Sequence, residues 1–193
     1  MNIIQQRIQE SIQTKQQVLE SPVLLAAIAD AIQRISACFQ AGGKVLFCGN
    51  GGSAADAQHL AAEFSGRFYQ DRDALPAEAL HTNTSYLTAV ANDYSYDVIY
   101  ARLIQGIGQA GDVLVGLSTS GNSKNIVRAF ETAHSKGMLT IGLTGVSGGA
   151  MAAISDIWIP IPSKDTPRIQ EAHMLIGHII CERVEAQLFP STT

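Results

Sequence analysis

The segment Gly43 to His59, GKVLFCGNGGSAADAQH, decides how this chain folds. Its apolar run over 44–48 predicts a buried strand, the glycines predict a tight turn, and Ser53 opens a predicted helix over 53–68. Glycines let the backbone approach a ligand closely, and the first turn of a helix offers free N–H groups to an anion. The segment is therefore typical of a site for a small phosphorylated molecule.

The alternation of strand and helix continues along the chain. Strands that are apolar on both faces, with helices between them, indicate a parallel sheet covered on both sides. We therefore expect an α/β fold with a central parallel sheet between two helical layers, built as one domain over residues 1–193. The expected strands cover 44–48, 78–80, 112–117, 138–143 and 156–161, and the expected helices 2–20, 22–40, 53–68, 84–92, 96–108, 122–136 and 167–188.

Composition excludes several classes of protein. A hydrophobic content of 46% with 17 Gly is typical of a globular chain, and the net charge of −4, with no basic run, argues against a nucleic-acid partner. The three cysteines show no CxxC spacing, which favours reduced thiols. The chain opens into a polar, Gln-rich helix, and its apolar runs are short for a membrane span. We expect a cytoplasmic protein without a membrane partner.

The first predicted helix has a narrow apolar stripe. Ile4, Ile8 and Ile12 recur every four residues, while the other faces are polar. Such a helix has little core of its own. We expect the helices over about 2–40 to contribute to an interface with another subunit.

Three loops follow strands at the carboxyl edge of the expected sheet, where parallel sheets bind ligands: 49–53, 118–123 and 144–149. The loop over 118–123, STSGNS, is the most informative, because four hydroxyl residues and one glycine precede a helix. Hydroxyls, backbone N–H groups and the helix dipole together can hold a phosphate. Neither a P-loop nor a complete GxGxxG motif is present. The alternative is a turn whose hydroxyls only cap the next helix.

His59 and Glu63 are four residues apart, so they project from one face of the helix over 53–68. His178 lies in an apolar stretch of the last helix, where an imidazole needs a partner. A carboxylate and a histidine near a sugar phosphate fit proton transfer between adjacent carbons. With Gln170 they also fit a divalent metal such as zinc. A structural role for either histidine is the third alternative.

Several motifs, in order, resemble one family. The chain is similar to the sedoheptulose 7-phosphate isomerases, or phosphoheptose isomerases, of the sugar isomerase (SIS) domain superfamily, with a flavodoxin-like fold. The matching motifs are CGNGGSAADAQH at 48–59, ANDY at 91–94, GDVL at 111–114, STSGNS at 118–123 and RIQEAH at 168–173. The resemblance implies conversion of sedoheptulose 7-phosphate to D-glycero-D-manno-heptose 7-phosphate through an enediol. It further implies the first step towards ADP-heptose and other nucleotide-activated heptoses, for lipopolysaccharide or surface glycans. The family is tetrameric, with active sites between subunits.

The resemblance also implies residue roles. Glu63 is expected to be the base that moves the proton between C1 and C2, and His178 the acid that protonates the carbonyl oxygen. One zinc ion per subunit is expected on His59, Glu63, Gln170 and His178. Arg67 is expected to reach the site of a neighbouring subunit. The positions expected to bind the substrate are Asn50, Gly51, Gly52, Ser53, Asn92, Asp93, Ser118, Thr119, Ser120, Ser123 and Gln170. Those in the loop over 118–123, called the serine loop below, are expected to hold the phosphate.

The chain departs from the family at one position. Pro167 precedes the RIQEAH motif, where some members carry Asp, so the role of that Asp is not transferred, although Asp165 is close by. The alternative function is that of a related, non-catalytic SIS-domain protein that binds the replication initiator DnaA. In that relative the equivalents of Glu63 and His178 are not kept, whereas both are present here, which favours the enzyme.

Overall fold

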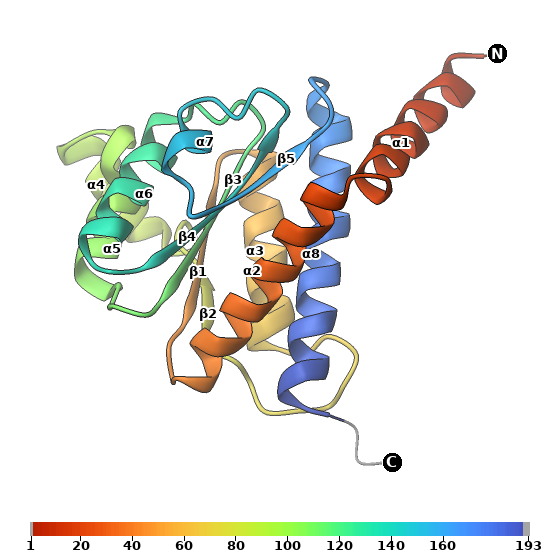
Figure 1. Cartoon of the computed structure of the whole chain (residues 1–193). Helices are drawn as coiled ribbons and strands as arrows, with labels where there is room; N and C mark the ends of the chain where they lie inside the picture. The colour runs from red at the N-terminus through yellow and green to blue at the C-terminus, as the bar shows by residue number, and fades with distance from the viewer. Residues whose placement is uncertain (1, 191–193) are drawn as a thin grey trace.

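A computed structural model describes residues 2–190 as a five-stranded parallel sheet between two layers of helices (Figure 1). The strands are β1 (Val45–Gly49), β2 (Ala77–Ala79), β3 (Val113–Ser118), β4 (Leu139–Gly145) and β5 (Ile157–Ile161). Their order across the sheet is β2-β1-β3-β4-β5, and every neighbouring pair is parallel. This is the flavodoxin-like order, in which the connection reverses direction between β1 and β3. The expected fold class is confirmed.

The helices are α1 (Ile3–Leu19), α2 (Pro22–Gln40), α3 (Gly52–Ser65), α4 (Thr84–Asp93), α5 (Ile99–Ile107), α6 (Lys124–Ser135), α7 (Met151–Ile154) and α8 (Thr166–Leu188), with a 3₁₀ turn η1 (Tyr96–Val98). Helices α2, α3 and α8 cover one face of the sheet, and α4 to α7 cover the other (Figure 1). Side chains alternate along each strand. Val45 and Phe47 therefore lie in the core beneath α2, α3 and α8, while Leu46 and Cys48 lie in the core beneath α4 to α7.

Helix α2 has the length and apolar composition of a membrane span, which the sequence patterns did not lead us to expect. It packs against α8 and β5, and it buries Ile28, Ile32 and Ile35 in the core. The position of α2 in the core therefore accounts for its apolar character.

Most boundaries differ from those expected by one or two residues, and a few helices differ in a more informative way. Helix α3 ends at Ser65 rather than at 68, because Gly66 leaves the helical conformation with φ −93° and ψ −112°. The helix expected over 96–108 is divided into η1 and α5, and α6 begins at Lys124 rather than 122. Helix α7 was not expected, because its four residues are too few to show a helical period.

Helix α1 projects from the body of the molecule, beside the start of α8 (Figure 1). Within it only Thr14 and Val18 are buried. The expected stripe is exposed in the single chain: Ile4 is 67%, Ile8 56% and Ile12 52% accessible. The backbone of α1 is held by Arg168, which donates to the carbonyl of Arg7 at 2.7 Å.

Candidate active site

The first glycine loop joins β1 to α3 and requires glycine at two positions. A Cβ atom at Gly49 would lie 2.2 Å from the carbonyl oxygen of Ser53, and Gly51 has φ +56°, in the left-handed region. Gly51 is the N-cap of α3 and supplies no side-chain hydrogen bond. The N–H groups of the first turn therefore have no side-chain cap, as an anion-binding helix end requires.

Asn50 is held by partners that the sequence patterns did not reveal. Its amide pairs reciprocally with that of Asn125, with N–O distances of 2.9 and 2.8 Å, and Tyr96 donates to its oxygen at 3.1 Å. Asn125 is 3% exposed and lies in the first turn of α6. The pair therefore links the glycine loop to the helix that follows the serine loop. Amide pairing across 75 residues leaves no local sequence signal.

The serine loop connects β3 to α6, and its hydroxyls do not cap the helix. Ser123 is the N-cap of α6 but makes no side-chain capping bond. Its hydroxyl instead lies 3.0 Å from that of Ser118, which also accepts from the N–H of Gly121 at 3.2 Å. Thr119 is half-buried and Ser120 is exposed. The capping alternative therefore fails for Ser123, and the arrangement favours an anion at this helix end.

The third loop, 144–149, supports the serine loop. The N–H of Gly145 donates to the carbonyl of Thr119 at 3.0 Å, and Asn122 accepts from the N–H of Ala150 at 2.9 Å. A Cβ atom at Gly121, where φ is +68°, would lie 1.9 Å from the carbonyl oxygen of Gly148. The two loops are packed so closely that only glycine fits at their contact.

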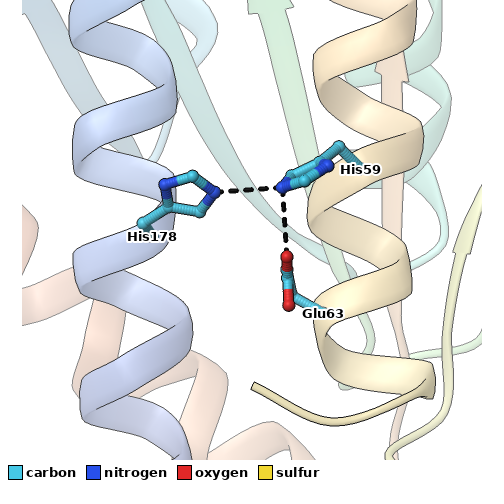
Figure 2. A group of neighbouring side chains, drawn as sticks. All are labelled: His59, Glu63 and His178. Atoms are coloured by element: carbon cyan, nitrogen blue, oxygen red, sulfur yellow. Dashed lines mark hydrogen bonds and ion pairs between the residues drawn. The ribbon is translucent and has the colours of Figure 1, made fainter. Parts of the chain in front are cut away.

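His59, Glu63 and His178 converge between α3 and α8 (Figure 2). Nε2 of His59 lies 3.0 Å from Nε2 of His178 and 3.0 Å from Oε1 of Glu63. One ligand atom from each residue lies within 4.8 Å of the others. The helices approach closely at Gly177, where a Cβ atom would lie 2.6 Å from both δ carbons of Leu60.

The chemistry of this triad fits a divalent cation. Two imidazole nitrogens and a carboxylate oxygen point at one another, yet a single Nε2–H on His59 cannot serve both contacts fully. A cation among the three donors satisfies all of them at once, and His and Glu are usual zinc ligands. His59 is 52% exposed and Glu63 21%, so the group is open to solvent.

The SIS domain family model matches residues 8–145. The chain is 50% identical over 186 residues to the phosphoheptose isomerase of Aneurinibacillus thermoaerophilus, covering 96% of this chain and 94% of that protein. It is 56% identical over 162 residues to the phosphoheptose isomerase of Rhodospirillum rubrum, covering 84% and 86%. This chain belongs to the phosphoheptose isomerase family of SIS-domain proteins.

Solved structures of phosphoheptose isomerases have the same fold. The enzyme from Neisseria gonorrhoeae gives a TM-score of 0.89 at 42% identity, over 95% of this chain and 97% of that one. The enzyme from Francisella tularensis gives 0.89 at 39% identity, over 94% and 95%. The expected family is confirmed, and these similarities support a catalytic role rather than binding of the initiator DnaA.

The residues expected from the family fall into two clusters. Gln170 contacts Ser53, with its amide nitrogen 3.5 Å from the hydroxyl, so it lies with the glycine loop. The triad is farther along the same two helices. Glu63 follows Ser53 by ten residues in α3, and His178 follows Gln170 by eight in α8, which correspond to about 15 and 12 Å of helix rise.

The remaining expected residues are at the surface. Asn92 and Asp93 end α4, where the amide of Asn92 donates to the carboxylate of Asp93 at 2.9 Å. Arg67 is exposed in the loop after α3. Pro167 occupies the first turn of α8, where its missing N–H removes no helical bond. None of these positions contradicts a role in substrate binding.

His173, which shares α8 with Gln170 and His178, is a core residue. It is fully buried, and its Nε2 lies 3.3 Å from the carbonyl of Thr144. Burial lowers the pKa of His173 to about 4, so this imidazole is neutral at physiological pH. Its place in the RIQEAH motif is therefore explained by packing.

Proposed function

We propose that this protein is an aldose–ketose isomerase that converts sedoheptulose 7-phosphate to D-glycero-D-manno-heptose 7-phosphate. The observation that carries the proposal is the convergence of Glu63 and His178, a base and an acid, in a chain about 50% identical to phosphoheptose isomerases. The DnaA-binding alternative has no comparable support.

In the proposed mechanism Glu63 removes a proton from C1 of the open-chain ketose. The electron pair forms the C1–C2 double bond of an enediol as His178 protonates the oxygen at C2. Glu63 then returns its proton to C2, and the C1 hydroxyl gives its proton to His178 as the aldehyde forms. Atoms and charge balance, and both groups end in their starting states.

The serine loop is the proposed phosphate site. Ser118, Thr119, Ser120 and Ser123 lie in the loop that leads into α6, and the start of α6, which has no side-chain cap, supplies N–H groups and the positive end of a helix dipole. The glycine loop, with Asn50 to Ser53, is the proposed site for the sugar hydroxyls, together with Asn92, Asp93 and Gln170. Binding at both ends would hold C1 and C2 at a fixed position relative to the base.

Zinc is the proposed metal, one ion per subunit, held by His59, Glu63 and His178. Gln170, the fourth ligand expected from the family, has its amide beside Ser53 and is two helical turns from His178 in α8, so it would have to turn away from Ser53 to reach the same ion. When bound, it would supply Lewis-acid polarisation of substrate oxygens. Glu63 has two carboxylate oxygens, so binding through one leaves the other available as a base.

A homotetramer with sites between subunits is part of the proposal. The two clusters are separated along α3 and α8 of one chain, and Arg67 is exposed. The apolar stripe of α1 is exposed as well. Contact between subunits would cover the stripe, and it would bring the triad and Arg67 of one chain to the loops of another.

The cellular role is proposed from the same chemistry. All three cysteines are unpaired and buried, which suits a reducing cytoplasm. The product would enter nucleotide-activated heptose synthesis for lipopolysaccharide or other surface glycans.

The test is turnover of sedoheptulose 7-phosphate by purified protein, with and without a chelator, together with elemental analysis for zinc. We expect turnover, and about one zinc per chain if the metal assignment is right. Lack of turnover in both conditions, with binding to DnaA, would overturn the enzyme in favour of the alternative. Full activity without zinc would remove only the metal role.

A further inference from the structure

A buried ion pair joins the end of α8 to the segment that follows α3. Nε of Arg72 lies 3.0 Å from Oε2 of Glu185, and the two side chains are only 3% and 2% exposed. Buried charges persist where they are paired and hydrogen-bonded. The proposed chemistry uses neither residue, so the pair needs an explanation.

Arg72 caps the end of α3 that carries Glu63. Its guanidinium donates to the carbonyls of Glu63 at 2.9 Å, Phe64 at 2.8 Å and Gly66 at 3.0 Å. The last carbonyls of a helix lack partners within the helix, so these bonds fix the terminal turn. The backbone of the proposed base is thus bonded directly to Arg72.

Glu185 holds the loop that follows. Its carboxylate accepts from the N–H groups of Phe68 at 3.0 Å, Tyr69 at 2.8 Å and Gln70 at 2.9 Å. Burial opposes ionisation, but these donors and Arg72 outweigh it and lower the pKa of Glu185. The carboxylate is therefore charged at physiological pH.

The same loop contacts the proposed acid. The ring of Phe68 lies 5.8 Å, centroid to centroid, from the ring of His178, which precedes Glu185 by two helical turns in α8. Arg67 immediately precedes Phe68. The Arg72–Glu185 pair is thus bonded to the backbone of Glu63. It is also bonded to the loop whose Phe68 contacts His178 and which contains Arg67.

We propose that Arg72 and Glu185 are positioning residues for the isomerisation, acting through Glu63 and His178. This inference rests on the proposed function. A base displaced by about 1 Å can cost on the order of 100-fold in rate, so fixing the end of α3 has a direct effect on turnover.

The experiment compares Glu185→Gln and Arg72→Lys with wild type and with Phe130→Leu. In Glu185→Gln, one carboxylate oxygen becomes an NH₂ group, which cannot accept from the N–H groups of the loop. In Arg72→Lys, the single ammonium group cannot reach all three carbonyls at the end of α3. Phe130 is buried in the core on the other face of the sheet, against Gly116, so its substitution lowers stability without touching α3, α8 or the loop at 66–72. Each protein is assayed for kcat and KM at a temperature where it is fully folded, and amide exchange is followed at 68–70.

We expect kcat to fall about 10- to 100-fold in both Glu185→Gln and Arg72→Lys, with a smaller change in KM, and amide exchange at 68–70 to accelerate in Glu185→Gln. Phe130→Leu should have a lower melting temperature than wild type but the same kcat. Retention of kcat per folded molecule in both Glu185→Gln and Arg72→Lys would overturn the positioning role, and so would an equal loss of kcat in Phe130→Leu. If Glu185→Gln does not fold, Arg72→Lys decides. An inactive wild type would instead overturn the proposed function itself.

Discussion

At the residue scale, Asn125 shows how a side chain outside the recognisable motifs can shape the site. Asn50 has both of its amide atoms bonded to Asn125, which is buried. Asn50 is therefore oriented before any ligand binds. Pre-orientation of this kind lowers the cost of binding.

We predict that Asn125→Leu will lower kcat/KM for sedoheptulose 7-phosphate by about 10-fold or more, because Asn50 loses its paired amide. The loss of two hydrogen bonds should also lower the free energy of unfolding by about 2 kcal/mol. Steady-state kinetics and urea denaturation measure the two effects. Glu131→Ala, at an exposed position of α6, is the control and should change neither. Unchanged kinetics in Asn125→Leu would show that the pair does not orient a substrate contact.

His173 predicts how stability depends on pH. Its pKa is about 4 in the folded chain and 6.5 as the ordinary value, so below pH 6.5 the unfolded chain binds a proton that the folded chain does not. Stability must therefore fall as pH decreases from 6.5 to about 4, by on the order of 3 kcal/mol.

The check is the free energy of unfolding as a function of pH for wild type and His173→Gln. Gln retains a donor for the carbonyl of Thr144 but does not titrate. We expect the variant to lack this part of the acid destabilisation. Parallel pH curves for the two proteins would contradict the assignment.

At the element scale, the spacing of α3 and α8 decides whether the triad can form. Gly177 permits this spacing, because any Cβ atom there would collide with Leu60, a buried residue of α3. The three side chains of the triad come from these two helices alone.

We predict that Gly177→Ala will force the helices apart, lowering the free energy of unfolding by about 1–3 kcal/mol and reducing both activity and zinc affinity. Gly106→Ala is the matched control. Gly106 also lies in a helix, but a Cβ atom there would have no neighbour within 4 Å, so a gain of about 0.5–1 kcal/mol is expected. Chemical denaturation and zinc titration distinguish the two. Equal behaviour of the two variants would show that helix spacing does not control the triad.

Local patterns predicted most of the helices and strands, because glycine turns, apolar runs and helix starts depend on residues that are close together in the sequence. The strand, turn and helix around Gly49 to Ser53 are the best example. What the sequence could not predict depends on distant contacts, as in the pairing of Asn50 with Asn125. Arg72 and Glu185 are 113 residues apart, and neither stands out in its own segment. The division of 96–108 escaped prediction because η1 has only three residues, too few to show a period of their own.

At the scale of the whole molecule, α1 is incomplete as a packed element. It exposes Ile4, Ile8 and Ile12, while only two of its residues are buried. A stripe of this kind is expected to be covered by another surface.

We predict that Ile8→Glu combined with Ile12→Glu will convert the proposed tetramer into smaller species, because charges would be buried at the contact. Light scattering after size exclusion measures the mass, and circular dichroism confirms that the helices remain. Activity should fall with the tetramer if sites lie between subunits. A tetramer of unchanged mass in the double variant, or a monomeric wild type, would contradict the interface.

In the proposed reaction, Glu63 moves a proton between C1 and C2 of a seven-carbon sugar phosphate. The most direct measurement follows sedoheptulose 7-phosphate in D₂O by NMR with wild type and with Glu63→Gln. We predict that wild type forms the aldose with deuterium entering at C2, while the folded variant loses turnover by at least about 1,000-fold. Turnover retained in Glu63→Gln would contradict the role of Glu63 as the base, and no turnover in wild type would contradict the proposed isomerase activity.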